Sequence, residues 1–396
     1  MKIYTVGGAV RDELLGLPVQ DRDYVVVGSS PEEMLAAGFK PVGKDFPVFL
    51  HPRSHEEYAL ARTERKSGHG YKGFTVYAAP DVSLEEDLLR RDLTINAMAM
   101  DEDGQLIDPY GGQDDLAARC LRHVSPAFAE DPVRILRLAR FAARFGFSVA
   151  PDTQALMREM VQLGEVDHLV AERVWQELSR GLMEATPSRM LTVLHTCGAL
   201  ARLLPEVAAL FDQAAPAPID SATLAAMLDA MASTAAPLDS RFAALCLLLS
   251  KARLAPFASS EAGQVIEALC ERLRVPNDCR ELGLLACREW HAIETAADAE
   301  SILGVLQRCD ALRKPARFIR LLAVCTGELA AERAQLLQQC RDRASQVDAG
   351  AIAATVSNKA DIAQAVRLAR LDALQSLLPT KPYGSSESAG QTPALP

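Results

Sequence analysis

Gly7-Gly8-Ala9-Val10-Arg11-Asp12 follows an apolar run at residues 3–6, and together they predict a strand that turns sharply into a helix. Glycine allows such a turn and lets the backbone come close to a ligand. Residues 10–15 predict the first turns of the helix, where free backbone N–H groups favour an anion. The segment is therefore a candidate phosphate-binding turn, although a plain turn is the ordinary explanation of two glycines.

Asp21 and Asp23 directly precede a second apolar run, residues 24–27, which predicts another strand. Residues two apart in a strand point to the same face, so the two carboxylates repel each other unless a cation lies between them. Mg²⁺ commonly takes one or two carboxylates together with substrate phosphates. A carboxylate pair that holds Mg²⁺ is the prediction, and a solvated strand end is the alternative.

The composition narrows the class of protein. A chain of 396 residues is expected to form two or more domains. The net charge of −10 weighs against a nucleic-acid partner unless arginines cluster locally. We expect no signal peptide and no membrane partner, because the longest apolar run falls short of the ~18 residues of a span. Nine cysteines without a Cys-x-x-Cys pair indicate reduced thiols and a cytoplasmic protein.

The first region, which ends near residue 123, contains two further predicted strands, at residues 46–50 and 56–61. It also contains further candidate polar residues. Glu57 is a candidate third carboxylate for the Asp21 and Asp23 site, or an exposed strand charge. Residues 64–74 hold three glycines and several positive charges, which predicts either a mobile segment that closes over a phosphate-bearing ligand or a surface hairpin.

The segment at residues 84–97 contains two adjacent arginines, Arg90 and Arg91, and an asparagine among apolar neighbours. Adjacent arginines suit phosphate, and a half-buried Asn96 needs hydrogen-bond partners. Alternatively, Arg90 pairs with Glu86 and Asp92 caps the next element.

A helix is predicted to begin at Pro132, after Glu130 and Asp131, and to carry an arginine stripe. At ~100° per residue the arginines fall within a sector of roughly 120°. The stripe consists of Arg134, Arg137, Arg140 and Arg144. The apolar face of the same helix consists of Ile135, Leu138 and Ala142. A stripe of this kind is usually a solvated face, but the neighbouring carboxylates favour a polar pocket. Asp131 and Arg134 together supply the acceptors and donors that a base edge requires.

These motifs, in this order, resemble a class II CCA-adding enzyme, a tRNA nucleotidyltransferase of the polymerase-β-like superfamily. The resemblance is dense over the first ~180 residues and weaker beyond them. It depends on Gly7-Gly8-Ala9-Val10-Arg11-Asp12, Asp21-Arg22-Asp23, Arg90-Arg91-Asp92-Leu93-Thr94-Ile95-Asn96-Ala97, Asp108-Pro109-Tyr110-Gly111-Gly112, and Glu130-Asp131-Pro132-Val133-Arg134 with Arg137-Leu138-Ala139-Arg140-Phe141.

The resemblance implies an α+β fold, with an N-terminal mixed α/β head followed by an elongated all-helical neck, body and tail. It implies template-independent addition of C, C and A to the 3′ end of tRNA from CTP and ATP. Asp21 and Asp23 would hold Mg²⁺ and be catalytic. Glu57 is added to the catalytic candidates from its place in the predicted strand, and not from the resemblance. The loop at residues 64–74 matches the family's flexible loop, which helps the switch from CTP to ATP.

The resemblance also assigns the nucleotide site. Gly8, Arg11 and Arg91 would contact the phosphates and sugar of the incoming nucleotide. Asp131 and Arg134 would bind the Watson–Crick edge of C or A, with Glu130 orienting the arginine. Arg137 and Arg140 would complete the site. The tRNA acceptor and TΨC arms would contact the helical part, for which the basic candidates are Arg272, Arg274, Arg280, Lys314, Arg317 and Arg320, although scattered surface arginines are the commoner explanation.

The C-terminal half departs from longer relatives that carry a metal-dependent HD phosphohydrolase domain. The helix at residues 241–251 has leucines at the positions where His-Asp would stand, and no histidine lies between His195 and His291. A hydrolytic metal centre needs such ligands, so we expect no phosphatase or phosphodiesterase activity. The predicted domains are a head at 1–123, a neck at 124–180, a body with a degenerate HD-like region at 181–290, a tail at 291–380 and a disordered end at 381–396.

Other functions remain open from sequence alone. A bacterial poly(A) polymerase or an enzyme that adds only the two cytidines would share the head. A non-catalytic RNA- or nucleotide-binding protein would keep the fold, although the intact Asp21 and Asp23 weigh against it. No feature of the sequence sets an oligomeric state.

Overall fold

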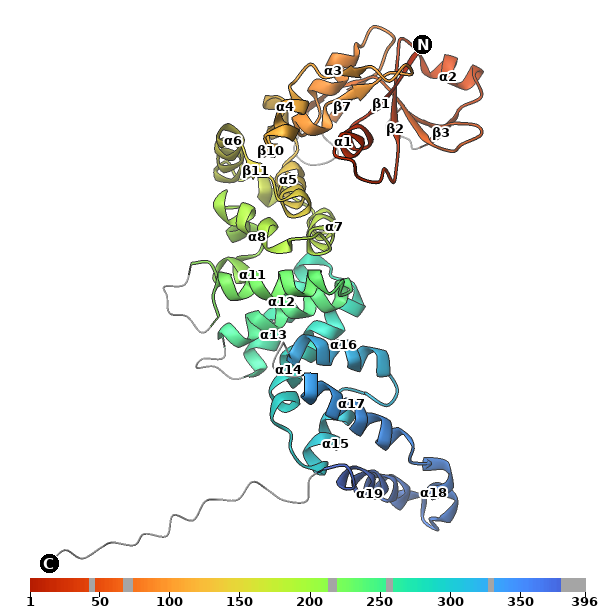
Figure 1. Ribbon diagram of the computed structural model, residues 1–396, viewed down its shortest axis with the longest axis vertical. Helices are drawn as coiled ribbons and strands as arrows, with labels where there is room; N and C mark the ends of the chain where they lie inside the picture. Colours follow the sequence, from red (N-terminus) through yellow and green to blue (C-terminus); the bar gives the residue numbers. More distant parts are fainter. Residues whose placement is uncertain (43–46, 67–73, 213–218, 254–258, 327–330, 379–396) are drawn as a thin grey trace, which may run out of the picture. The chain divides into compact units, whose positions relative to one another are not determined.

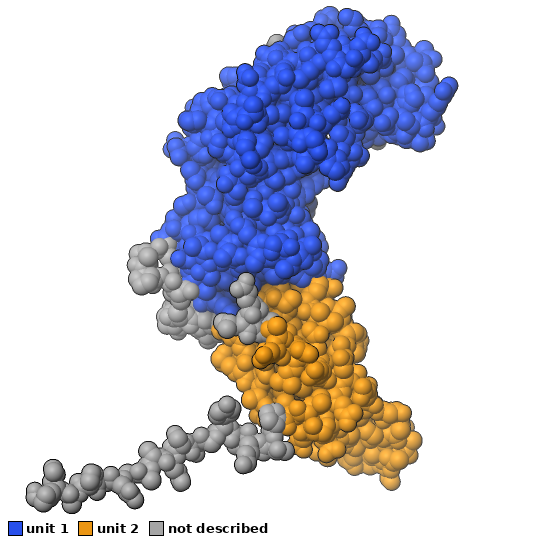
Figure 2. Space-filling model, viewed as in Figure 1, with its two compact units in different colours: residues 1–280 blue, residues 281–396 orange. Residues whose placement is uncertain are grey.

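The computed structural model describes residues 1–42, 47–66, 74–212, 219–253, 259–326 and 331–378. The chain divides into two compact units, residues 1–280 and 281–396 (Figure 2). Every residue of the predicted site belongs to the first unit. The end predicted to be disordered, residues 381–396, lies outside the described residues, as do residues 67–73 of the predicted loop.

A mixed sheet forms the centre of the N-terminal part (Figure 1). Its strands, in spatial order, are β3 (Lys40–Val42), β4 (Val48–Leu50), β5 (Glu57–Leu60), β2 (Asp23–Val27), β1 (Lys2–Val6), β8 (Ala99–Met100) and β9 (Leu106–Ile107). β1 runs antiparallel to β2, and β2 runs parallel to β5. The end of β1 therefore meets the beginnings of β2 and β5, and Asp23 pairs with Val6 on one side and Glu57 on the other.

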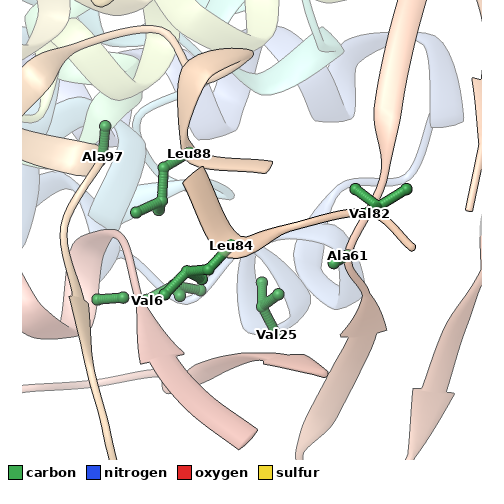
Figure 3. Packing of buried hydrophobic residues seen from close by; sticks show 8 residues of the cluster. Val6, Val25, Ala61, Val82, Leu84, Leu88 and Ala97 are labelled. Atoms are coloured by element: carbon green, nitrogen blue, oxygen red, sulfur yellow. The ribbon is translucent and has the colours of Figure 1, made fainter. Parts of the chain in front are cut away.

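Both faces of this sheet are covered by apolar packing. Val25 and Val26 are consecutive in β2 and each is 1% exposed, so their side chains enter cores on opposite faces. One core joins Val25 to Leu84 and Leu88 (Figure 3). The other joins Val26 to Met34 and to aromatic residues of the β4 and β5 side. The sheet is thus fixed on both sides, and its strand ends can hold polar groups in place.

Short helices connect the strands, and local side-chain caps determine where two of them begin. These helices are α1 (Gly8–Leu14), α2 (Pro31–Ala36), α3 (Leu84–Leu89), η1 (Thr94–Asn96), α4 (Gly112–Ala117) and η2 (Pro126–Glu130). Ser30 and Glu33 form a capping box at α2, and Ser83 and Glu86 form one at α3. Each box satisfies backbone N–H groups that the first helical turn leaves free.

Two small sheets flank the main one. β6 (Thr63–Lys66) pairs antiparallel with β7 (Phe74–Tyr77), so the described ends of the predicted loop are the arms of a hairpin. The expectation of a mobile closing segment concerns residues outside the described part. β10 (Cys120–Leu121) pairs in parallel with β11 (Ser148–Val149) and joins the head segment to the chain that follows α5.

α5 (Val133–Phe145) begins after Pro132, as predicted, and ends at Gly146, which has a φ of 69°. Ile135, Leu138 and Ala142 are 0% exposed, which confirms the predicted apolar face. The helices that follow within the first unit are α6 (Pro151–Gln162), η3 (Glu165–His168), α7 (Ala171–Leu182), α8 (Pro187–Thr196), α9 (Ala199–Leu203), α10 (Pro205–Ala208), α11 (Ser221–Ser233), α12 (Leu238–Arg253) and α13 (Ser259–Leu273).

The second unit is helical throughout its described residues. Helix α14 (Asn277–Thr295) contains the boundary, and α15 (Ala299–Arg308), α16 (Pro315–Thr326), α17 (Ala331–Ser345), α18 (Ala349–Thr355), η5 (Lys359–Asp361) and α19 (Ile362–Gln375) follow. No helix in the described part of the chain has the length and apolarity needed to cross a membrane. In α12 the residues from Phe242 to Leu249 are all buried, so the leucines at the HD-like position serve as core.

Candidate active site

A cavity of about 710 Å³ lies where the strand ends of the sheet face α5 and the start of α7. Its lining contains nine arginines and six carboxylates. All the residues predicted for catalysis, metal binding and nucleotide binding line it, namely Gly8, Arg11, Asp21, Asp23, Glu57, Arg91, Asp131, Arg134, Arg137 and Arg140. The fold therefore brings together residues that are up to 132 positions apart, between Gly8 and Arg140.

The turn between β1 and α1 requires glycine at position 7. Gly7 has a φ of 70°, and a Cβ atom built on it would lie 2.8 Å from Nη1 of Arg91. Its backbone N–H donates to the carbonyl of Met98 at 3.1 Å. A larger residue would strain the backbone and displace the arginine, so the glycine keeps Arg91 close to the turn.

Asp21, Asp23 and Glu57 form the carboxylate side of the cavity. All three are exposed, and neither aspartate makes an ion pair or a side-chain hydrogen bond with another described residue. No group of three or more His, Cys, Asp or Glu side chains among the described residues is placed to hold a metal ion. Two free carboxylates fit an ion that completes its shell with substrate phosphates and water.

Asp87 organises the arginines beside the turn. It is 0% exposed and accepts hydrogen bonds from Arg90 Nη2 at 2.6 Å and from Arg91 Nη2 at 3.2 Å. Burial by itself raises the pKa of Asp87, but the charges of Arg90 and Arg91 outweigh it and hold the pKa below its usual range. The backbone N–H of Arg62 also donates to Asp87, at 3.3 Å.

Arg11 is buried beneath the cavity, with 3% of its surface exposed. It binds Asp12 at 2.7 Å and donates to Asn96, and its guanidinium lies 5.1 and 4.9 Å from the ring centres of Phe141 and Phe145. Burial lowers the pKa of Arg11, against the opposing charge of Asp12. Arg11 thus connects α1 with α5 through both charge and stacking.

All four arginines of the α5 stripe line the cavity. Arg137 donates to Asp92 at 2.8 Å, and Arg140 donates to Glu177 at 2.7 Å. The pKa of Arg137 is raised, chiefly by the charge of Asp92. Arg144 binds Asp12 at 3.0 Å. The polar-pocket interpretation of this stripe is therefore the correct one.

The two residues predicted to contact the base are both held by their surroundings. Arg134 donates to the carbonyls of Ala127 at 2.8 Å and Arg90 at 2.7 Å. Asp131 accepts two hydrogen bonds from Arg173, at 3.2 and 2.9 Å, and one from the backbone N–H of Val133 at 3.1 Å. Both side chains are fixed before any ligand arrives.

The comparisons with known proteins agree with this geometry. Residues 3–122 match a family model described as the poly A polymerase head domain, and residues 146–211 match one described as a probable RNA and SrmB-binding site of polymerase A. A Multifunctional CCA protein from Dechloromonas aromatica is 56% identical over 96% of this chain and 98% of that protein. One from Cupriavidus taiwanensis is 55% identical over 96% of this chain and 100% of that protein.

The chain belongs to the CCA protein family. The predicted family, enzyme class and principal function are thereby confirmed. The family with this polymerase-β-like head uses a divalent metal ion.

The fold of the family is also seen in solved structures. A CCA-adding enzyme from Bacillus stearothermophilus, in complex with CTP, is 24% identical and gives a TM-score of 0.65 over 94% of this chain and 89% of that one. A CCA-adding enzyme from Thermotoga maritima, complexed with tRNA_CCA, is 21% identical and gives a TM-score of 0.62 over 95% of this chain and 87% of that one. The predicted α+β fold with a helical remainder is confirmed.

Six charged residues line the cavity that were not among the predicted site residues: Asp12, Arg62, Arg90, Asp92, Arg144 and Arg173. Arg90 and Asp92 flank the predicted Arg91 in the sequence. Arg144 belongs to the stripe, which was its signal. Asp12 lies inside the glycine motif, and its burial was not visible from one sequence. Arg62 and Arg173 have no local signal, because their partners come from distant segments.

The basic residues considered for tRNA binding are mostly engaged by carboxylates of their own unit. Arg272 binds Glu206, Arg274 binds Glu172 and Arg280 binds Glu267. In the second unit, Lys314 and Arg317 both bind Glu281. Exposed pairs of this kind contribute little stability, so they do not prevent an exchange for phosphate.

Proposed function

We propose that the chain adds C, C and A in turn to the 3′ end of tRNA, using CTP and ATP without a nucleic-acid template. One observation carries the proposal: two free carboxylates, Asp21 and Asp23, share a single cavity with the arginines of α5 and with Asp131. Nucleotidyl transfer needs both a metal-binding acidic group and a cationic surface for the triphosphate. The cavity supplies both.

The reaction forms a bond between the tRNA 3′-oxygen and the α-phosphorus of the nucleotide, and breaks the bond from that phosphorus to the bridging oxygen, so that pyrophosphate leaves. The backbone at Gly8 and the side chains of Arg11 and Arg91 contact the phosphates and sugar. Arg137 and Arg140 complete the cationic wall. These groups work by positioning the triphosphate and neutralising its charge.

Asp21 and Asp23 hold Mg²⁺, with Glu57 as an additional carboxylate at the same strand ends. When bound, the metal supplies charge stabilisation for the attacking and leaving oxygens of the displacement. The support for this assignment is the donor set: oxygen ligands only, exposed, and without partners among the described residues.

The base is chosen by Asp131 and Arg134, with Glu130 assisting the arginine. Cytosine and adenine both carry an exocyclic amino group, whereas uracil and guanine carry a carbonyl oxygen in the corresponding place. A carboxylate accepts from the amino group and repels the carbonyl. Because a mismatched base leaves a buried polar group unpaired, discrimination can be strong.

The helical regions position tRNA, and we assign a head at 1–123, a neck at 124–180, a body at 181–290 and a tail at 291–380. The acceptor and TΨC arms are the parts of tRNA proposed to contact these helices. All nine cysteines are free thiols, which supports a reducing compartment and the cytoplasm. We also propose that the HD-like region has no phosphohydrolase activity, because histidine ligands are missing from residues 196–290.

The test is primer extension on a tRNA transcript that lacks its terminal CCA, with Mg²⁺ and each nucleotide alone or in combination. CTP alone should add two residues, and CTP with ATP should add three and then stop. ATP alone should add none. Asp21→Ala and Asp23→Ala should abolish incorporation and keep tRNA binding, whereas Asp114→Ala, at an exposed position outside the cavity, should leave both unchanged. Unlimited extension with ATP alone would indicate a poly(A) polymerase.

A further inference from the structure

Asp131 is bound by a residue of another helix in a two-pronged ion pair. Arg173 lies in the first turn of α7, and its Nη1 and Nη2 donate to the two carboxylate oxygens of Asp131 at 3.2 and 2.9 Å. The two side chains are 27% and 21% exposed, so the pair is largely shielded from water. Two parallel hydrogen bonds fix orientation as well as distance, which a single contact does not.

The donors leave little freedom to the carboxylate. Each carboxylate oxygen has two lone pairs. Oδ1 accepts from Arg173 and from the backbone N–H of Val133, at 3.2 and 3.1 Å, so both of its lone pairs are used. Oδ2 accepts from Arg173 and keeps one lone pair. Both residues line the cavity together with Arg134, so the remaining acceptor is available to a ligand there.

From this geometry we infer that Arg173 is a positioning residue for nucleotide selection: it locks Asp131 so that a single acceptor stands beside the Arg134 donors. The inference depends on the proposed role of Asp131 in contacting the base. One fixed acceptor next to a donor matches cytosine and adenine and mismatches uracil and guanine. A carboxylate free to rotate offers its oxygens in several directions and discriminates less well.

The arrangement of α7 supports a positioning role. Glu177 lies one turn further along the same helix and binds Arg140 at 2.7 Å. One helix therefore holds an acidic and a basic member of the site, each with a partner of opposite charge. Arg180, at the other end of α7, is exposed and does not line the cavity. It provides a matched control on the same helix.

The experiment measures kcat and KM for CTP, UTP, ATP and GTP with tRNA acceptors ending in the appropriate residue. Arg173→Ala should lower the kcat/KM preference for CTP over UTP and for ATP over GTP by roughly 5- to 150-fold, the range of one two-pronged base contact. Arg173→Lys keeps the charge without the fork and should restore only part of the preference. Arg180→Ala should match the wild type. The unfolding midpoint of each variant is measured alongside.

A double-mutant comparison decides whether Arg173 acts through Asp131. In an Asp131→Ala background, removing Arg173 should change the nucleotide preference no further. An unchanged preference in Arg173→Ala, or an equal loss in both backgrounds, overturns the inference. If the wild-type protein incorporates neither CTP nor ATP, the proposed function itself fails. If Asp131→Ala alters the preference and Arg173→Ala does not, only the inference about Arg173 fails.

Discussion

Replacing Asp92 by Asn should destabilise the first unit, because this carboxylate joins the head to α5. Asp92 is 8% exposed. Its Oδ1 accepts from Leu93 N at 2.9 Å and Asn96 Nδ2 at 3.0 Å, and its Oδ2 accepts from Arg137 Nε at 2.8 Å. An amide has only one acceptor oxygen. The NH₂ group of the Asp92→Asn side chain must therefore face either the N–H donors of Leu93 and Asn96 or the N–H donor of Arg137.

The size of the effect follows from these contacts. Removing one partner of a fully buried ion pair costs about 3–5 kcal/mol, and a hydrogen bond to a charged group contributes about 1.5–3 kcal/mol. The Arg137 side chain is 37% exposed, so water replaces part of what is lost. We expect the free energy of unfolding to fall by about 2–3 kcal/mol at pH 7.

The assay is guanidinium unfolding followed by tryptophan fluorescence in a Trp290→Phe background. Trp175 then reports on the first unit, where its ring lies 5.3 Å from that of Phe242. Asp114→Asn, an exposed change without a side-chain partner among the described residues, is the control. A loss of less than about 0.5 kcal/mol in Asp92→Asn, no larger than an ordinary surface change, would refute the reasoning.

The same variant predicts a pH dependence with a definite sign. Burial alone would raise the pKa of Asp92, but the charge of Arg137 and the hydrogen bonds hold that pKa below its usual range. A depressed pKa stabilises the folded state above the unfolded value of about 3.9, and this contribution is lost as the pH falls below it. The difference between wild type and Asp92→Asn should be constant from pH 7 to pH 5 and shrink below about pH 4. A difference that grows on acidification contradicts this.

Other changes give simpler expectations. Asp87→Asn loosens Arg90 and Arg91 and should raise KM for CTP and ATP alike, by about tenfold if one charge-assisted contact is lost. Steady-state kinetics with each nucleotide measure this, and a rise in KM for one nucleotide only would contradict the prediction. Gly7→Ala should cost about 1–3 kcal/mol of stability from backbone strain and also weaken incorporation; an unchanged unfolding midpoint would contradict it. Purified protein should show no metal-dependent phosphatase activity above a protein-free blank, in the wild type and in Asp21→Ala alike; activity that copurifies with the protein would restore a hydrolytic role.

Much of the site was predictable because its signals are local. The apolar run, the two glycines and the Asp21 and Asp23 pair lie within one short segment, and the sheet brings that segment together by pairing β1 with β2. The stripe of α5 is likewise a matter of helical spacing. The α5 arginines repeat at the period of the helix that carries them, whereas only Asp23 belongs to β2 and Asp21 lies two residues before it.

The ion-pair partners were less predictable, because they depend on tertiary structure. Glu86 was the alternative partner for Arg90 by spacing alone, yet it accepts from Ser83 in the capping box, and Asp87 binds the arginine. Arg173 and Asp131 are 42 residues apart, and no local pattern relates them. The packing of α5 against α7 determines this pair, and one sequence does not reveal that packing.

The most direct test of the account is a crystal structure of the protein with CTP and Mn²⁺, a Mg²⁺ substitute visible by anomalous scattering. The account predicts a manganese peak within ligand distance of Asp21 and Asp23, the triphosphate against Gly8 and Arg91, and the cytosine edge at Asp131. A nucleotide bound elsewhere, or a manganese site that excludes both aspartates, would contradict it.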